Sequence, residues 1–314
     1  PTGKKMATAG VGICSPLLYW WRDDMQIERR FQRLFPFFLI APALLFVFMV
    51  ILYPTIFSFW LSLHENRRRE FFFVGLDNFQ RILNNQNFWD GLGRTAVYGL
   101  FYIGLVMIFG FLLALLFHRG VRWGGLFLTV VFIPWMLSEI VAGIMWRWMF
   151  LPGIGVLQNA LGPLLGGYSF LGQGPGAMSV IIAATVWRGV AFSLLLLLAG
   201  LQTVPGDLGE AASIDGANPW QRFWKITWPL MLPTTQVTIV FLTIQAVNAV
   251  GMFLSISDGG PGRSTEVVSL QMYKQALQFN NFGFASAVSV LMFFLNAALA
   301  LVYINGMRAQ NALD

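Results

Sequence analysis

The sequence has few charged residues and almost no cysteine. Only 11% of its 314 residues are Asp, Glu, Lys or Arg, whereas soluble domains contain about 25%. A soluble enzyme or a disordered chain of this length needs far more charge to stay dispersed. The single cysteine, Cys14, permits no internal disulfide, so the composition also excludes a secreted disulfide scaffold.

Motifs for catalysis and for cofactor binding are missing as well. The two histidines, His64 and His118, lie far apart, and no Cys/His cluster has metal-ligand spacing. No Gly-x-x-x-x-Gly-Lys-Ser/Thr loop occurs that would cradle ATP. No basic run interleaved with aromatic residues indicates nucleic-acid binding. We therefore predict that this chain has no catalytic residue, binds no metal or cofactor, and does not bind nucleic acid.

Apolar residues, by contrast, are abundant. They make up 57% of the chain, and the mean hydropathy is +0.66, so the chain requires a hydrocarbon solvent. Runs that are free or nearly free of charge predict six transmembrane helices, at residues 34–63, 95–117, 126–146, 177–201, 230–256 and 284–304. We predict an all-α membrane protein divided into an N-terminal tail (1–34), a first transmembrane helix (35–63), an external loop (64–94), a core of five helices (95–305) and a C-terminal tail (306–314).

The distribution of basic residues predicts the orientation in the membrane. An even number of spans places both termini on one side, where eleven Lys and Arg residues would lie, against eight on the other side. Cytoplasmic loops carry the excess of Lys and Arg, so we predict that both termini are cytoplasmic. The run from Arg67 to Arg69 opposes this bias. Basic residues at the ends of spans also explain the net charge of +6.

Residues 204–229 form a polar segment between two predicted spans, and their pattern predicts two short helices joined by a turn. Gly216 suits the left-handed residue that ends the first helix, and Asn218 is a good N-cap for the second. Trp220, Phe223 and Trp224 share one helix face. Periodicity alone leaves two interpretations open: a lever that docks into another protein, or an interfacial helix that rests on lipid headgroups.

The same segment resembles the EAA loop of ABC-importer permeases. The matching residues are Glu210-Ala211-Ala212, then Asp215-Gly216-Ala217, and then Phe223, Ile226 and a closing Pro229. Segments 73–79, 198–205 and 258–265 are also similar to the carbohydrate branch of the family, so the resemblance extends over residues 35–305. It implies a type I ABC importer permease fold of six transmembrane helices, close to permeases of the maltose and glycerol-phosphate importer type. The short connection between the first two spans differs from the large periplasmic domain of the larger maltose permease.

The resemblance also implies a function and a set of partners. It implies a multi-pass permease in a bacterial cytoplasmic (inner) membrane that imports a sugar or oligosaccharide. The partners would be a homologous second permease forming a heterodimer, two ATPase subunits that bind ATP-Mg, and an extracytoplasmic solute-binding protein. The residues of the EAA loop that would couple to the ATPase are Glu210, Ala211, Ala212, Asp215, Gly216, Ala217 and Phe223.

Polar side chains inside the predicted spans are candidates for the substrate pathway, because such residues face a bundle interior or a water path. Gln245 and Asn248 would share one helix face at i and i+3. Arg188 would either pair with Glu139 or meet an anionic substrate. Polar residues also hold helices together in many bundles, and this alternative stays open. The predicted pathway residues are Asn248, Gln245, Thr243, Arg188, Thr185 and Phe192.

Two alternatives to a permease for neutral sugars remain. The first is an ABC permease for an anionic substrate, either glycerol phosphate or an acidic oligosaccharide, which Arg188 and the basic run at 67–69 favour. The second is an ion-coupled secondary transporter. Such a transporter carries coupling carboxylates in its spans and often shows internal repeats. Only Glu139 meets the first condition, and the two halves of the sequence show no repeat.

Overall fold

The computed structural model describes residues 39–67 and 70–311, so the predicted tail at 1–34 lies outside the described residues. The chain divides into two compact units, Pro1–Phe57 and Ser58–Asp314. In the described parts, five helices are long and apolar enough to cross a membrane, or six if one bent pair of helices forms a single span. The fold therefore belongs to the predicted class of helical membrane proteins.

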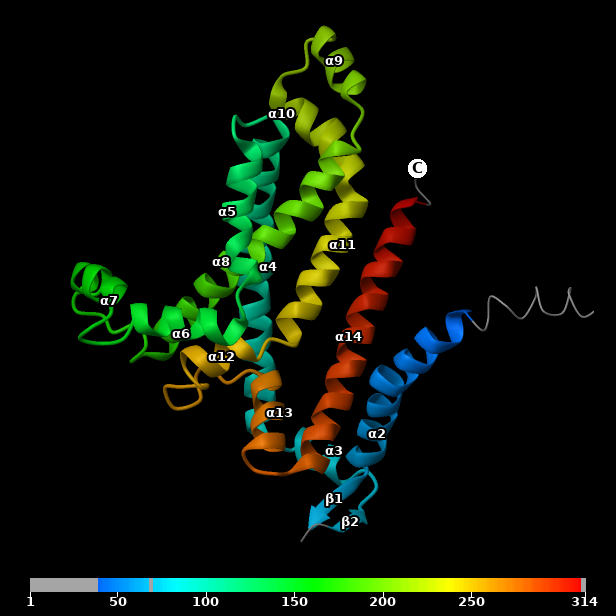
Figure 1. The fold of residues 1–314 in the computed structure, drawn as a ribbon, viewed down its shortest axis with the longest axis vertical. Helices are drawn as coiled ribbons and strands as arrows, with labels where there is room; N and C mark the ends of the chain where they lie inside the picture. Colours follow the sequence, from blue (N-terminus) through cyan, green and yellow to red (C-terminus); the bar gives the residue numbers. More distant parts are fainter. Residues whose placement is uncertain (1–38, 68–69, 312–314) are drawn as a thin grey trace, which may run out of the picture. The chain divides into compact units, whose positions relative to one another are not determined.

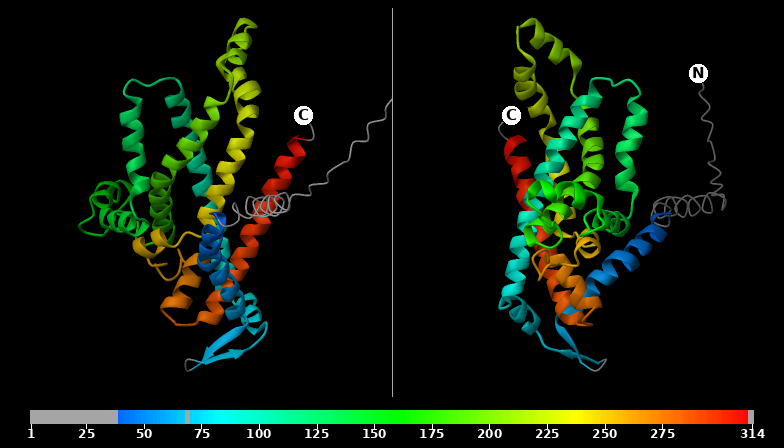
Figure 2. Two further views of the ribbon diagram at one scale, coloured as in Figure 1. Left: turned by 45° about the vertical axis from the view of Figure 1, so that its right-hand side comes forward. Right: turned by 90° about the vertical axis from the view of Figure 1, so that its left-hand side faces the viewer.

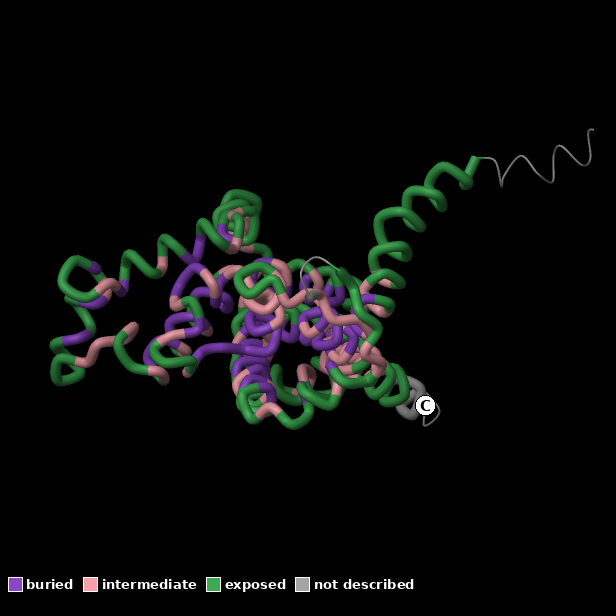
Figure 3. The backbone as a smooth tube through the Cα atoms, turned by 90° about the horizontal axis from the view of Figure 1, so that it is seen from below, coloured by how far each residue is buried: buried purple, intermediate pink, exposed green. Residues whose placement is uncertain are grey.

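The first apolar helix extends from Leu39 to Ser62, in agreement with the predicted span at 35–63. It includes a π-helical turn, η1 (Phe48–Leu52), followed by α2 (Tyr53–Ser62). Every residue from 39 to 54 is exposed, and the helix is green along this stretch in Figure 3. An apolar helix with an exposed surface is suited to a hydrocarbon environment, because all its backbone hydrogen bonds are made internally.

A small β-hairpin follows, which the sequence pattern did not predict. Strand β1 (His64–Arg67) pairs with β2 (Glu70–Phe73) in antiparallel register, with His64 opposite Phe73. The hairpin leads to α3 (Asp77–Leu83), where the buried Asn78 donates hydrogen bonds to the backbone oxygens of Ser62 and His64 at 2.9 and 3.0 Å. A buried amide thus fixes the start of the hairpin onto α3.

The core of the second unit is built on α4 (Gln86–His118) and α8 (Gly174–Gln202), which pack along each other. Small residues allow this close approach, as in many membrane helix pairs. A Cβ at Gly110 would lie 2.5 Å from the hydroxyl of Ser193, and one at Gly189 would lie 2.8 Å from that of Tyr102. Buried residues, purple in Figure 3, concentrate in this bundle.

Two of the predicted spans are broken in the structure. The third consists of α5 (Gly124–Met136) and α6 (Glu139–Met149), which meet at an angle of 94°. The fifth consists of α11 (Trp228–Val247) and α12 (Gly251–Ile256), separated by residues 248–250. The short helices α6 and α12 pack against each other (Figure 1), where Gly143 abuts the side chain of Ser255. The predicted ranges 126–146 and 230–256 are therefore not single helices.

The remaining elements connect these helices. A short helix, α7 (Val156–Leu161), and the turn η2 (Pro163–Leu165) lie between α6 and α8. After α12 the chain forms α13 (Val268–Leu277) and the last long helix, α14 (Phe282–Asn311). Between α8 and α11 lie α9 (Gly206–Ile214), α10 (Pro219–Arg222) and the π-helical turn η3 (Phe223–Thr227). Within the second unit, α9 and α10 lie at the end opposite to α13 and the β-hairpin (Figures 1 and 2).

Candidate functional site

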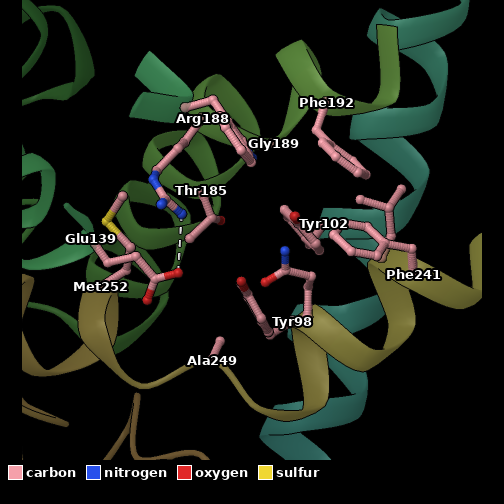
Figure 4. A pocket seen from close by; sticks show the side chains of 13 residues that line it. Tyr98, Tyr102, Glu139, Thr185, Arg188, Gly189, Phe192, Phe241, Ala249 and Met252 are labelled. Atoms are coloured by element: carbon pink, nitrogen blue, oxygen red, sulfur yellow. Dashed lines mark hydrogen bonds and ion pairs between the residues drawn. The ribbon is translucent and has the colours of Figure 1, made fainter. Parts of the chain in front are cut away.

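A small cavity of about 30 Å³ lies among α4, α8, α11 and the two helix breaks (Figure 4). A volume of this size holds about one water molecule. Four of the six predicted pathway residues line it, namely Thr185, Arg188, Phe192 and Gln245. The structure therefore brings four of the six predicted residues together around one cavity.

The break in the third span is fastened by Arg188 of α8. Its guanidinium donates a hydrogen bond from Nη1 to Oε1 of Glu139 at 3.0 Å, the dashed line in Figure 4. Its Nε donates to the backbone oxygen of Leu137 at 3.1 Å. Leu137 follows the last residue of α5 and has an extended conformation. Its carbonyl oxygen therefore accepts no hydrogen bond from a following turn of α5. The Arg188 side chain thus forms hydrogen bonds with groups on both sides of the break.

Aromatic rings form one wall of the cavity. The Phe192 ring stacks on Phe241 at a centroid distance of 4.3 Å and on Trp135 at 5.8 Å. Such a stack presents a flat apolar surface of the kind that accommodates the apolar face of a sugar. Residues Trp135 and Phe241 were not predicted, because aromatic side chains in an apolar span carry no signal of their own.

Two tyrosines of α4 complete the cavity. Tyr98 and Tyr102 stack at 5.6 Å, and both are buried. They come from α4, which the resemblance did not connect with the substrate. The signal that could have revealed them is their spacing, because hydroxyl-bearing rings at i and i+4 share one face of a helix.

Two predicted pathway residues lie outside the cavity. The hydroxyl of Thr243 donates to the backbone oxygen of Ile239 at 2.8 Å and lies 3.1 Å from the hydroxyl of Tyr303, so it connects α11 to α14. Asn248 is exposed just after α11, where its amide donates to the backbone oxygen of Ile244 at 2.8 Å. Thr243 therefore links two helices, whereas the hydrogen bond of Asn248 stays within the end of its own helix.

The second candidate site is the two-helix segment 206–227. Its local conformation agrees with the sequence pattern: Gly216 is left-handed with φ of 80°, and Asn218 forms a capping box with Gln221. The structure differs in one respect, because α10 continues through η3 into α11 without a break, so helix runs from Pro219 to Val247. The second helix is therefore a direct extension of the fifth span.

Two side chains hold the two-helix segment in place, the predicted Phe223 and Arg222, which was not predicted. Arg222 donates from Nη1 to the backbone oxygen of Gly209 at 3.3 Å, which connects α10 to α9. The ring of Phe223 packs edge-on against Phe111 of α4 at 5.7 Å. By contrast, α9 has no buried residue, and large apolar side chains are exposed: Leu208, Ile214, Trp220 and Trp224.

A metal centre is not indicated, since no group of three His, Cys, Asp or Glu residues suited to a metal ion occurs within residues 39–67 and 70–311.

The described features are those of a membrane transport component: apolar spans, two broken helices around a polar cavity, and an exposed two-helix segment. Comparison with known proteins agrees, because the model of the family described as "binding-protein-dependent transport system inner membrane component" matches residues 106–313. The chain belongs to this family.

Several relatives match over most of their length. The trehalose/maltose transport system permease protein MalF of Thermococcus litoralis is 34% identical over 85% of this chain and 92% of its own. The trehalose transport system permease protein SugA of Mycobacterium tuberculosis is 33% identical over 88% and 90%. The sn-glycerol-3-phosphate transport system permease protein UgpA of Agrobacterium fabrum is 32% identical over 85% and 92%.

A solved structure establishes the fold. A chain in the crystal structure of a bacterial ABC transporter involved in the import of the acidic polysaccharide alginate matches with a TM-score of 0.76 at 20% identity. The match covers 90% of this chain and 99% of that chain. The predicted ABC importer permease fold is therefore confirmed.

Proposed function

We propose that this chain is a permease subunit of an ATP-driven importer for a sugar or an oligosaccharide, and that it forms half of the translocation pathway. The observation that carries the proposal is the exposed two-helix segment 206–227, which has the EAA sequence and is continuous with the fifth span. The names of the trehalose/maltose and trehalose permeases support a carbohydrate as the substrate.

The two-helix segment suits a role in coupling to an ATPase. Its acidic residues Asp207 and Glu210 and its aromatic residues Trp220 and Trp224 are exposed, so they are accessible to a partner. Because α10, η3 and α11 form one helical run, a displacement of the segment is transmitted along α11 towards the cavity. The proposed coupling residues are Glu210, Ala211, Ala212, Asp215, Gly216, Ala217 and Phe223.

The proposed complex contains this chain, a homologous second permease, two ATPase subunits that bind ATP-Mg, and an extracytoplasmic solute-binding protein. In the proposed orientation the two-helix segment and both termini are cytoplasmic. The β-hairpin is external, which is consistent with its place at the opposite end of the second unit (Figure 1).

The chemistry of the cavity supports a carbohydrate pathway. The amide of Gln245 supplies donors and an acceptor for sugar hydroxyls, and the hydroxyl oxygen of Thr185, whose hydrogen is donated to the backbone of α8, supplies a further acceptor. The ring of Phe192 supplies an apolar surface. Asn248 stays in the proposed pathway because it is exposed beside the break at the end of α11. The hydrogen bonds of Thr243 support a packing role instead.

The proposal is tested by uptake into proteoliposomes that contain the complete complex. With the binding protein outside and ATP in the lumen, radiolabelled trehalose or maltose should accumulate, and without ATP it should not. Glu210→Lys should reduce uptake while ATP hydrolysis continues or the ATPase dissociates. Uptake driven by a proton gradient in the absence of ATP would overturn the proposal in favour of an ion-coupled secondary transporter.

A second candidate substrate class is anionic, either glycerol phosphate or an acidic oligosaccharide. The observation that favours it is the presence of Arg188 in the cavity, together with the glycerol-phosphate permease among the relatives. The same uptake assay with glycerol 3-phosphate distinguishes this class from neutral sugars.

A further inference from the structure

We infer that the cavity admits neutral carbohydrates and excludes anionic ones because Glu139 neutralises Arg188, which makes Glu139 a specificity-determining residue. This inference rests on the proposed function and adds the charge of the substrate to it. It depends on the ion pair between α6 and α8, on what holds each partner in place, and on the other side chains of the cavity.

The cavity contains one positive and one negative side chain, and they are in direct contact. Among its lining residues, Arg188 and Glu139 are the charged ones, and their nearest atoms are 3.0 Å apart. Their formal charges cancel. The remaining polar groups include the amide of Gln245 and three hydroxyls, all uncharged, which bond sugar hydroxyls without preference for a charge.

The guanidinium of Arg188 has a second anchor that does not depend on Glu139. Its Nε donates to the backbone oxygen of Leu137 at 3.1 Å, at the end of α5. This carbonyl is fixed by the helix that precedes it. Removal of the carboxylate of Glu139 therefore leaves the cation at the cavity wall, with Nη1 free to bind another anion.

The carboxylate of Glu139 is also held in place. Glu139 is the first residue of α6, where the helix dipole favours a negative charge. On its other side it packs against α12, because a Cβ at Gly251 would lie 2.6 Å from both its Cβ and Oε2. The carboxylate is thus confined between Arg188 and α12. A phosphate or carboxylate of a substrate that approached Arg188 would meet this negative charge and be repelled.

The experiment measures binding to the purified complete complex in lipid nanodiscs, without the solute-binding protein. The probes are radiolabelled trehalose and maltose, each compared with its 6-phosphate. The wild-type complex should bind the neutral sugars and should bind the phosphates at least tenfold more weakly. In Glu139→Gln the affinity for the phosphates should rise about tenfold or more, which corresponds to one hydrogen bond to a charged group.

Two control variants test whether the charges of Glu139 and Arg188 cause the rise in affinity for the phosphates. Glu139→Asp keeps the negative charge and should not gain affinity for the phosphates. The double variant Glu139→Gln with Arg188→Gln lacks both charges and should lose the gain of the single variant. The inference is overturned if the affinity for the phosphates does not rise in Glu139→Gln. It is also overturned if the rise persists in the double variant.

A third variant covers the case in which Glu139→Gln fails to assemble. Gln245→Lys adds a cation to the cavity wall and leaves the ion pair intact, so it should raise the affinity for the phosphates. If it does not, the inference is overturned. Wild-type binding of the phosphates in preference to the sugars would also overturn it and would leave carbohydrate import standing. Failure of the wild-type complex to bind any of these probes, with no ATP-dependent uptake, would overturn the proposed function itself.

Discussion

At the scale of single residues, Gln245 and Asn248 show how a helix end separates neighbours in sequence. A continuous helix would place both on one face. Because α11 ends at Val247, the Asn248 amide instead turns back to the carbonyl of Ile244, whereas Gln245 lines the cavity. A spacing of three residues therefore predicts a common face only where the helix is unbroken.

The contact between Gly143 and Ser255 gives a prediction at the same scale. A Cβ at residue 143 would overlap the Ser255 hydroxyl and lie 2.9 Å from its Cβ, which cannot move away by rotation. Gly143→Ala should therefore destabilise the packing of α6 on α12 by about 1–3 kcal/mol. Thermal unfolding of the purified complex measures this effect.

The matched control is Gly104→Ala in α4. Residue 104 is exposed, and nothing lies within 4 Å of its Cβ position. This substitution should leave stability unchanged or raise it slightly, because Ala favours a helix by about 1 kcal/mol over Gly. Equal effects of the two substitutions would show that the packing of α6 on α12 does not depend on a small residue at 143.

At the scale of elements, the turn between α9 and α10 depends on one glycine. Gly216 has φ of 80°, a conformation that costs other residues about 1–2 kcal/mol. Gly216→Ala should therefore lower transport per ATP hydrolysed, because the angle between α9 and α10 changes. The measurement is the ratio of sugar uptake to phosphate release in proteoliposomes.

Gly209→Ala provides the matched comparison within the same segment. Gly209 lies inside α9, has no atom within 4 Å of its Cβ position, and does not have a positive φ. Transport per ATP should stay at the wild-type ratio in this variant. A normal ratio in Gly216→Ala would instead show that the turn tolerates a side chain and that coupling does not depend on its geometry.

At the scale of the whole molecule, the proposed orientation predicts which ends are accessible from outside. In a Cys14→Ser background, a cysteine at Glu70 should react with a membrane-impermeant maleimide on intact cells. A cysteine at Ser213 should react only after the membrane is opened. Both positions are exposed, and they lie in β2 and α9. The reverse pattern of labelling would invert the orientation of the chain.

The sequence by itself determined the helical membrane class, the approximate spans and the conformation of the turn between α9 and α10, because hydropathy, Gly216 and the Asn218 cap act locally. Only the tertiary structure decided where the third and fifth spans break and which side chains meet there. The local sequence around Arg188 or Glu139 does not indicate that the two residues pair. They are 49 residues apart and meet only when α6 packs beside α8. The cavity and its charge balance are therefore properties of packing, which local patterns do not encode.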